Sequence, residues 1–243
     1  MAAVPASGPA VSLQDAVALA GRYPLLSGCD LEVALGETVL LEGANGAGKT
    51  SLLRVCAGLV PLAGGRLRVL GLDPLRHRAR LRRRVGLLAH ANHLYDELTV
   101  TENLRFSVRA AGGDVRRVDP AAERWGLVGR LGRTTAGRLS AGQRRRVALA
   151  ALCARWPELW LLDEPHAGLD AAARRLVDEL LGDLAAAGAT VVLASHEPGA
   201  FAARAQRAVT LQGGRVVGER RGDVASTADG SVARAPAPVV HVA

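Results

Sequence analysis

Lysine and aromatic residues are scarce in this chain of 243 residues, and long apolar runs are absent. Of its 31 basic side chains only Lys49 is a lysine. Because arginine serves everywhere else, Lys49 indicates a position that requires a compact point charge. No apolar run approaches the ~20 residues needed to cross a bilayer, so we predict a chain that does not span a membrane. No basic residue precedes an apolar stretch in residues 1–10, which argues against a secretory signal.

The small aromatic content restricts how the basic charge is interpreted. A formal net charge of +8 is compatible with nucleic acid or with an anionic membrane surface as a partner. Aromatic residues make up only 3% of the chain, too few for a base-stacking surface, and no helix-turn-helix pattern is present. We therefore expect no nucleic acid partner. The one dense basic run, Arg76–Arg84, is predicted to be a solvated helix face or to lie near lipid head groups.

The cysteines form no pair. Cys29, Cys56 and Cys153 have neither CxxC spacing nor the spacing of metal ligands. Reduced thiols in a cytoplasmic protein are the expected state.

Apolar strand-like segments alternate with helix-like segments, which favours a largely parallel sheet with helices on its faces. The strand-like segments are residues 38–41, 67–70, 85–88, 159–162, 190–194 and 209–211. The helix-like segments are residues 51–59, 171–187 and 197–205.

A different pattern occupies the middle of the chain. Residues 91–143 contain short helical stretches at 101–110 and 120–128 and no convincing strand. We predict a helical lobe here, inserted in a core of about residues 11–90 and 144–217, the whole forming one domain over residues 1–220. Residues 221–243 are rich in Ala, Pro, Ser and Gly and are predicted to be a disordered tail.

A phosphate-binding loop is predicted at Gly43–Thr50, which matches G-x-x-x-x-G-K-[ST] in full between a strand and a helix. The glycines let backbone N–H groups point at phosphate oxygens, and the start of the helix adds its positive dipole end. Lys49 is expected to neutralise the β- and γ-phosphates of ATP, and the Thr50 hydroxyl to help hold Mg²⁺. The residues expected to contact the nucleotide here are Asn45, Gly46, Ala47, Gly48, Lys49, Thr50 and Ser51.

Two carboxylates, Asp163 and Glu164, end the buried-strand pattern at 159–162. The carboxyl ends of such strands form the crevice in which α/β sheets bind ligands. Asp163 suits the Mg²⁺ ligand, and Glu164 is placed to orient or deprotonate an attacking water. Taken alone, the pair fits a solvated strand end or a helix N-cap equally well; the phosphate loop favours the functional interpretation.

Further motifs point to one family. Leu139-Ser140-Ala141-Gly142-Gln143 resembles the LSGGQ signature of ABC ATPases, with Ala141 where the family has its first glycine, and a helix is predicted to follow from Arg144. Ala167–Asp170 resembles the D-loop that follows the Asp–Glu pair. His196, after the strand-like segment, resembles the switch histidine that contacts the γ-phosphate. Because these motifs occur in the family's order over residues 11–217, the chain is identified as a member of the ABC ATPase family.

The resemblance implies a fold and a mechanism. The fold is an α/β P-loop NTPase of the ABC type: a mostly parallel core with a β-rich edge and an inserted helical lobe. Two copies pair head to tail, and each ATP lies between one copy's phosphate loop and the other copy's signature. Ser140, Gly142 and Gln143 then contact the partner's ATP, while Lys49, Glu164 and His196 act on the ATP of their own chain.

Two positions depart from the family's pattern. His90 occupies the place of a glutamine that contacts Mg²⁺ and water. The histidine either keeps a hydrogen bond there, which its protonation would make pH-sensitive, or simply holds the loop in place. The aromatic residue that stacks on adenine is not evident: its place falls near residues 18–20, and Tyr23 is out of register.

A narrower resemblance concerns cargo. His90, LTVTENLRF at 98–106, LSAGQRRRVALA at 139–150 and LEG at 41–43 are similar to the ATP-binding subunits of the haem exporters of cytochrome c maturation. This implies a peripheral protein on the cytoplasmic face of the cell membrane that works with integral membrane permease subunits. Because the membrane subunit chooses the cargo, an exporter of drugs, lipids or peptides stays open. A soluble ABC ATPase that acts without transport is the third alternative.

Overall fold

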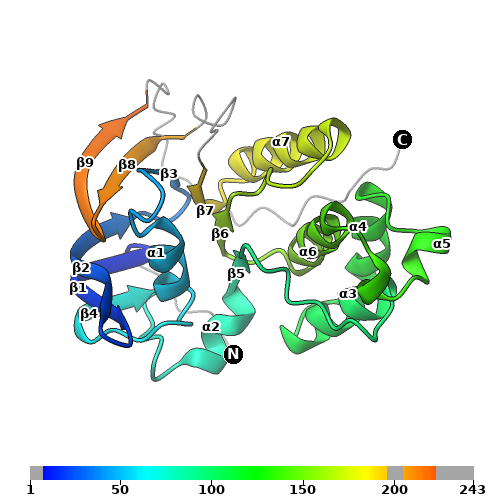
Figure 1. Ribbon diagram of the computed structural model, residues 1–243, viewed down its shortest axis with the longest axis horizontal. Helices are drawn as coiled ribbons and strands as arrows, with labels where there is room; N and C mark the ends of the chain where they lie inside the picture. Colours follow the sequence, from blue (N-terminus) through cyan, green and yellow to red (C-terminus); the bar gives the residue numbers. More distant parts are fainter. Residues whose placement is uncertain (1–7, 196–204, 223–243) are drawn as a thin grey trace. The chain divides into compact units, whose positions relative to one another are not determined.

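The computed structural model describes residues 8–195 and 205–222, which form two compact units (Figure 1). The sheet unit comprises the described residues among 8–89, 158–165 and 188–222, and the helical unit comprises 90–157 and 166–187. His196, residues 197–204 of a predicted helix and residues 223–243 of the predicted tail lie outside the described residues.

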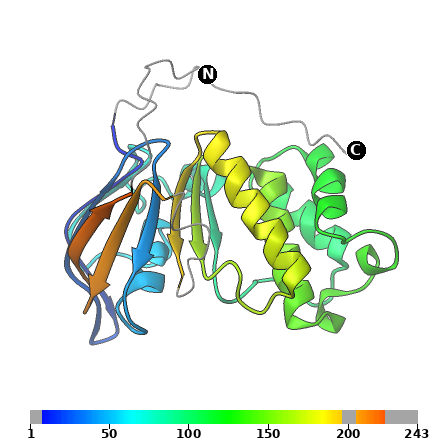
Figure 2. The same ribbon diagram turned by 90° about the horizontal axis from the view of Figure 1, so that it is seen from above.

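The sheet unit is built on a six-stranded sheet with the order β5-β6-β7-β3-β8-β9, whose strands lie side by side in Figure 2. The first five strands run parallel, and β9 pairs antiparallel with β8. Every residue of β6 and β7 is buried, as expected for parallel strands covered on both faces. The bounds are β3 Thr38–Glu42, β5 Val85–Leu88, β6 Leu159–Asp163, β7 Thr190–Ala194, β8 Arg207–Gln212 and β9 Arg215–Arg221.

A second, antiparallel sheet forms the β-rich edge. Its order is β2-β1-β4, with β1 at Val11–Ala20, β2 at Tyr23–Val33 and β4 at Gly64–Val69. The residue pattern did not predict β1 and β2 individually. The register of β1 shifts between Leu13 and Ala16, and Asp15 between them has a φ of 46°. A bulge of this kind breaks the alternation by which a strand is found in a sequence.

The two sheets of the sheet unit share one hydrophobic core. Helix α1, Lys49–Cys56, contacts β6 and β7 of the large sheet and β2 of the small one. Its Leu52, Leu53 and Val55 are fully buried among the core residues of both sheets. Helix α2, Arg78–Arg84, leads directly into β5.

The helical unit packs around two buried anchors, Trp125 and Leu127, both with an exposed fraction of 0%. α3 and α4 both contact α6, and Arg124 of α4 forms an ion pair of 2.7 Å with Asp183 of α7. A capping box formed by Thr99 and Glu102 begins α3. The helices are α3 Val100–Ala110, α4 Val118–Arg124, α5 Gly129–Gly132, α6 Ala141–Arg155 and α7 Ala171–Ala186.

Three predicted helix boundaries were wrong. The helix predicted at 120–128 is α4, which ends at Arg124 because Gly126 adopts a φ of 64°. The helix predicted at 51–59 is α1, which ends at Cys56 shortly before Gly58 with its φ of 70°. The helix expected from Arg144 begins at Ala141, because the Ser140 side chain caps it.

The fold class is confirmed: a mostly parallel core, a β-rich edge and a helical unit whose helices α3 to α6 are inserted between β5 and β6 and whose α7 follows β6. Among the described residues, none of the helices combines the length and the apolar character that crossing a membrane requires.

All three cysteines are free. Burial raises the pKa of the Cys56 thiol to about 12 and that of Cys153 to about 11, so neither is a ready nucleophile.

Candidate active site

The loop between β3 and α1 wraps closely against neighbouring backbone. Gly43 has a φ of 139° and Gly48 a φ of 109°, both in the region that favours glycine. A Cβ on Gly43 would collide with the carbonyl oxygen of Leu211, and a Cβ on Gly48 would lie 3.1 Å from the Cα of Gly214. Both glycines are therefore required by conformation and by space, as the predicted phosphate loop demands.

Lys49, the single lysine, is buried at this loop with an exposed fraction of 7%. Its Nζ donates hydrogen bonds of 2.6 Å to the Gly43 carbonyl and 3.1 Å to the Ala44 carbonyl. An ammonium group is thus held over the loop at the first residue of α1, where the helix dipole is positive. The other loop residues predicted to contact nucleotide lie here too: Asn45, Gly46, Ala47 and Gly48 in the loop, and Thr50 and Ser51 in the first turn of α1.

The acidic pair meets the loop at the end of β6. The Thr50 hydroxyl Oγ1 donates a hydrogen bond of 2.8 Å to Oδ2 of Asp163, a carboxylate only 4% exposed. Since β3 and β6 are parallel strands of one sheet, residues 113 positions apart in the chain meet at their carboxyl ends.

Glu164, the next residue, is held in an unusual backbone conformation. Its φ is 47°, and its N–H donates a 2.8 Å hydrogen bond to the Ala194 carbonyl at the end of β7. Ser195 Oγ donates to Glu164 Oε2 at 3.3 Å. A non-glycine residue in the left-handed region often marks a site where geometry matters more than local stability.

The predicted signature residues belong to the helical unit. Ser140 is the N-cap of α6: its Oγ accepts from the Gln143 N–H at 3.2 Å, and Gln143 Oε1 accepts from the Ser140 N–H at 2.9 Å. Gly142 lies in the first turn, where a Cβ would lie 2.8 Å from the carbonyl oxygen of Gly168. The segment after the acidic pair thus packs directly over the signature glycine.

Replacing Gly142 with alanine is expected to destabilise the fold by about 1–3 kcal/mol, because the added Cβ meets backbone rather than a flexible side chain. Thermal unfolding measures the loss. Gly8→Ala is the matched control, since nothing lies within 4 Å of a Cβ built there. Equal melting temperatures for both variants would contradict the packing of Gly142 against Gly168.

His90, His196 and Tyr23 are the other residues considered in the sequence analysis. His90 is exposed and begins the segment of the helical unit that follows β5. His196 lies outside the described residues. Tyr23 is 79% exposed and follows the β1–β2 turn, where it pairs with Ala20.

Two side-chain contacts went unpredicted. Ser195 contacts Glu164, and His166 Nε2 lies 3.0 Å from Oδ1 of Asp178 on α7. Ser195 follows a predicted parallel strand, so its place at the same sheet edge as Asp163 was a usable signal. The separation of His166 and Asp178 in the sequence gives no indication of their contact.

Comparison with known families agrees with this architecture. Residues 26–167 match the family model described as ABC transporter. The chain belongs to the ABC transporter family and is an ATP-binding ATPase of the ABC type.

Within that family, the chain is similar to proteins named cytochrome c biogenesis ATP-binding export protein CcmA. It is 41% identical to the one from Paraburkholderia xenovorans over 194 residues, which cover 72% of this chain and 85% of that protein. It is 45% identical to the one from Methylococcus capsulatus over 178 residues, which cover 72% and 86%.

Solved structures give the same result for the fold. The ATP binding subunit of an ABC transporter is 27% identical, with a TM-score of 0.78 over 87% of this chain and 89% of that one. A dimeric ATP-binding cassette in a post-hydrolysis state, bound to ADP and Pi, is 25% identical, with a TM-score of 0.77 over 87% of this chain and 98% of that one.

Proposed function

We propose that this chain hydrolyses ATP to drive export through a separate integral membrane subunit, and that the cargo is haem for cytochrome c maturation. The hydrogen bond between Thr50 and Asp163 beside the buried Lys49 carries the assignment of the motor. The assignment of haem as the cargo rests on the similarity to CcmA proteins and on the sequence motifs around His90 and the signature.

The donor set fits a nucleoside triphosphate with its divalent cation. In this proposal Lys49 and the N–H groups of the loop bind the β- and γ-phosphates, because an ammonium and a helix start both favour anions. The Thr50 hydroxyl and the Asp163 carboxylate offer hard oxygen ligands 2.8 Å apart and would hold Mg²⁺. When bound, that cation neutralises phosphate charge.

We assign the handling of the attacking water to Glu164. Its carboxylate is the second one at the end of β6, and Ser195 donates a hydrogen bond that orients it. His196 follows Ser195 in the chain and is proposed to contact the γ-phosphate, in line with the family's motif order.

A second copy completes the site in this proposal. Ser140, Gly142 and Gln143 stand at the start of α6, where a helix N-terminus suits an anion. They would contact the ATP held by the phosphate loop of the other copy, in a head-to-tail homodimer. The similar solved cassette is itself described as dimeric, which supports the pairing. Hydrolysis then depends on closure of the dimer, a motion that a transporter can use.

An exposed aromatic pair on the helical unit is our proposed docking place for the membrane subunit. Tyr95 and Phe106 are 51% and 46% exposed, and their ring centroids lie 4.9 Å apart in an edge-to-face arrangement. The buried Asn103 donates to the carbonyls of Tyr95, Leu98 and Thr99, so the loop that carries Tyr95 is rigid. Rigid exposed aromatics favour protein interfaces.

Affinity purification of the tagged chain from its own cells in mild detergent tests the proposal. Mass spectrometry is expected to recover integral membrane proteins of cytochrome c maturation together with the chain. The double variant Tyr95→Ser and Phe106→Ser is expected to lose them while it still binds ATP. Val217→Ser, at a position 56% exposed on β9, is the matched control and should retain them.

Each alternative has its own outcome in this experiment. Recovery of a different permease would leave the ATPase assignment in place and would change the proposed cargo. Soluble or ribosomal partners without any integral membrane protein would refute the transport function, together with the proposed peripheral place on the cytoplasmic face of the membrane. In either case the ATPase assignment would stand. The division into a domain over residues 1–220 and a tail remains part of this proposal.

A further inference from the structure

Helix α2 is rich in arginines, and most of their side chains are exposed. Its buried residue is Leu81, which is 3% exposed. Arg84 forms a bidentate ion pair with Glu158, in which Nε donates to Oε1 at 2.8 Å and Nη2 donates to Oε2 at 2.7 Å. That hydrogen bonding raises the pKa of Arg84, which stays charged. Arg78, Arg80 and Arg83 are exposed and have no carboxylate partner among the described residues.

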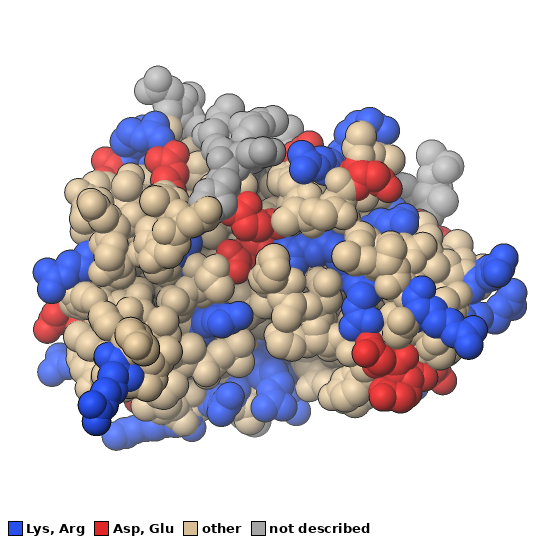
Figure 3. Space-filling model, viewed as in Figure 1, with Lys and Arg blue, Asp and Glu red and all other residues tan. Residues whose placement is uncertain are grey.

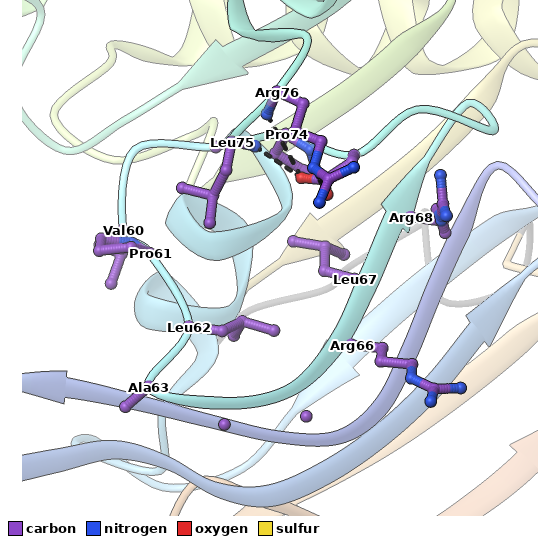
Figure 4. Close-up of a pocket in the computed structure, with 14 residues that line it drawn as sticks. Val60, Pro61, Leu62, Ala63, Arg66, Leu67, Arg68, Pro74, Leu75 and Arg76 are labelled. Atoms are coloured by element: carbon purple, nitrogen blue, oxygen red, sulfur yellow. Dashed lines mark hydrogen bonds and ion pairs between the residues drawn. The ribbon is translucent and has the colours of Figure 1, made fainter.

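A hollow of about 420 Å³ adjoins the start of α2 on the sheet unit. Its lining includes the leucines Leu62, Leu67 and Leu75 and the arginines Arg66, Arg68 and Arg76 (Figure 4). The one carboxylate in its lining, Asp73, accepts from the Leu75 N–H and lies 3.7 Å from Arg76. The hollow is thus lined by apolar side chains and by arginines, with a single carboxylate.

Two large apolar side chains stand exposed beside this charge. Leu75 is 70% exposed, and Leu59, next to two residues that line the hollow, is 52% exposed. In Figure 3 basic side chains predominate along the lower left margin of the molecule. We call the whole set the basic surface: it consists of Arg66, Arg68, Arg76, Arg78, Arg80, Arg83, Leu59 and Leu75.

We infer that the basic surface docks directly on anionic phospholipid, independently of any membrane subunit. Arginines beside exposed leucines match a membrane interface, where the guanidinium groups meet phosphates and the leucines enter the acyl boundary. Nucleic acid fits less well as a partner. The basic surface has no aromatic residue on which a base could stack, and exposed leucines gain nothing from contact with a charged phosphate backbone. The inference goes beyond the proposed function and does not depend on the cargo.

Vesicle flotation with the purified full-length chain tests the inference. The chain is expected to bind vesicles that contain phosphatidylglycerol and not vesicles of phosphatidylcholine alone. The triple variant Arg78→Gln, Arg80→Gln, Arg83→Gln should lose roughly a hundredfold in partition, since each surface arginine contributes roughly fivefold. Arg109→Gln, Arg130→Gln, Arg133→Gln removes the same amount of charge from three exposed arginines that do not belong to the basic surface, and should stay within about threefold of wild type.

The apolar part of the basic surface has its own test. Leu75→Ser is expected to weaken partition roughly tenfold, while Val217→Ser on β9 leaves it unchanged. Unaltered basal ATPase activity shows that each variant is folded. Equal binding of wild type to both kinds of vesicle, equal losses in the two arginine variants, or binding to duplex DNA without binding to anionic vesicles would each overturn the inference. Neither ATP nor a membrane subunit enters the flotation, so its failure is distinct from a failure of the proposed function.

Discussion

Replacing Glu164 with glutamine is expected to slow ATP hydrolysis by roughly 10²–10⁴-fold while ATP stays bound, the range in which a general base contributes. The amide keeps the size of the carboxylate and can still accept from Ser195, but it cannot take a proton from water. Glu164 N–H remains fixed to the Ala194 carbonyl, so the backbone at φ 47° is not disturbed. Phosphate release measures turnover, and gel filtration with ATP should reveal a long-lived dimer.

A matched control for this substitution lies just before the same strand. Glu158 immediately precedes β6, where its carboxylate pairs with Arg84 rather than with the phosphate loop. Glu158→Gln should leave turnover within about twofold of wild type, because an exposed ion pair contributes little. Normal turnover by the Glu164→Gln variant would show that another group handles the attacking water.

Removing Lys49 is expected to abolish tight nucleotide binding. Hydrogen bonds to a charged group contribute about 1.5–3 kcal/mol each, so loss of the ammonium in Lys49→Ala should weaken ATP affinity roughly 100-fold or more. Isothermal titration of ATP into the purified chain measures the change. Arg54→Ala is the matched control: it removes an exposed basic residue from the same helix and should bind as wild type does.

Lys49→Arg adds a sharper comparison in a chain that otherwise uses only arginine. The lysine is 7% exposed, and its Nζ contacts two loop carbonyls at 2.6 and 3.1 Å. A planar guanidinium is larger and offers its donors in a fixed fork, so it does not fit the same enclosure. We expect binding as weak as that of the alanine variant. Wild-type affinity in either variant would exclude Lys49 from phosphate binding.

Several features of the fold were predictable because their signals are local. The glycine loop, the buried strand before Asp163 and the alternation of strands and helices are read within short windows of sequence. The bulged strand β1 and its partner β2 were not, because the shift near Asp15 removes the alternation. The early end of α4 and the capped start of α6 depend on single residues, Gly126 and Ser140, whose effect competes with a continuing helical pattern.

The sequence by itself determined the family, from several motifs in a fixed order, and it predicted the phosphate loop and the neighbouring carboxylates Asp163 and Glu164, because each of these two features lies in one continuous motif. Only the tertiary structure decided which distant residues touch. Thr50 meets Asp163 through the parallel order of β3, β7 and β6, and Gly142 lies under the carbonyl of Gly168. The same holds for the hollow between the arginines of β4 and the start of α2. Such contacts follow from strand order and packing, which no local window of residues contains.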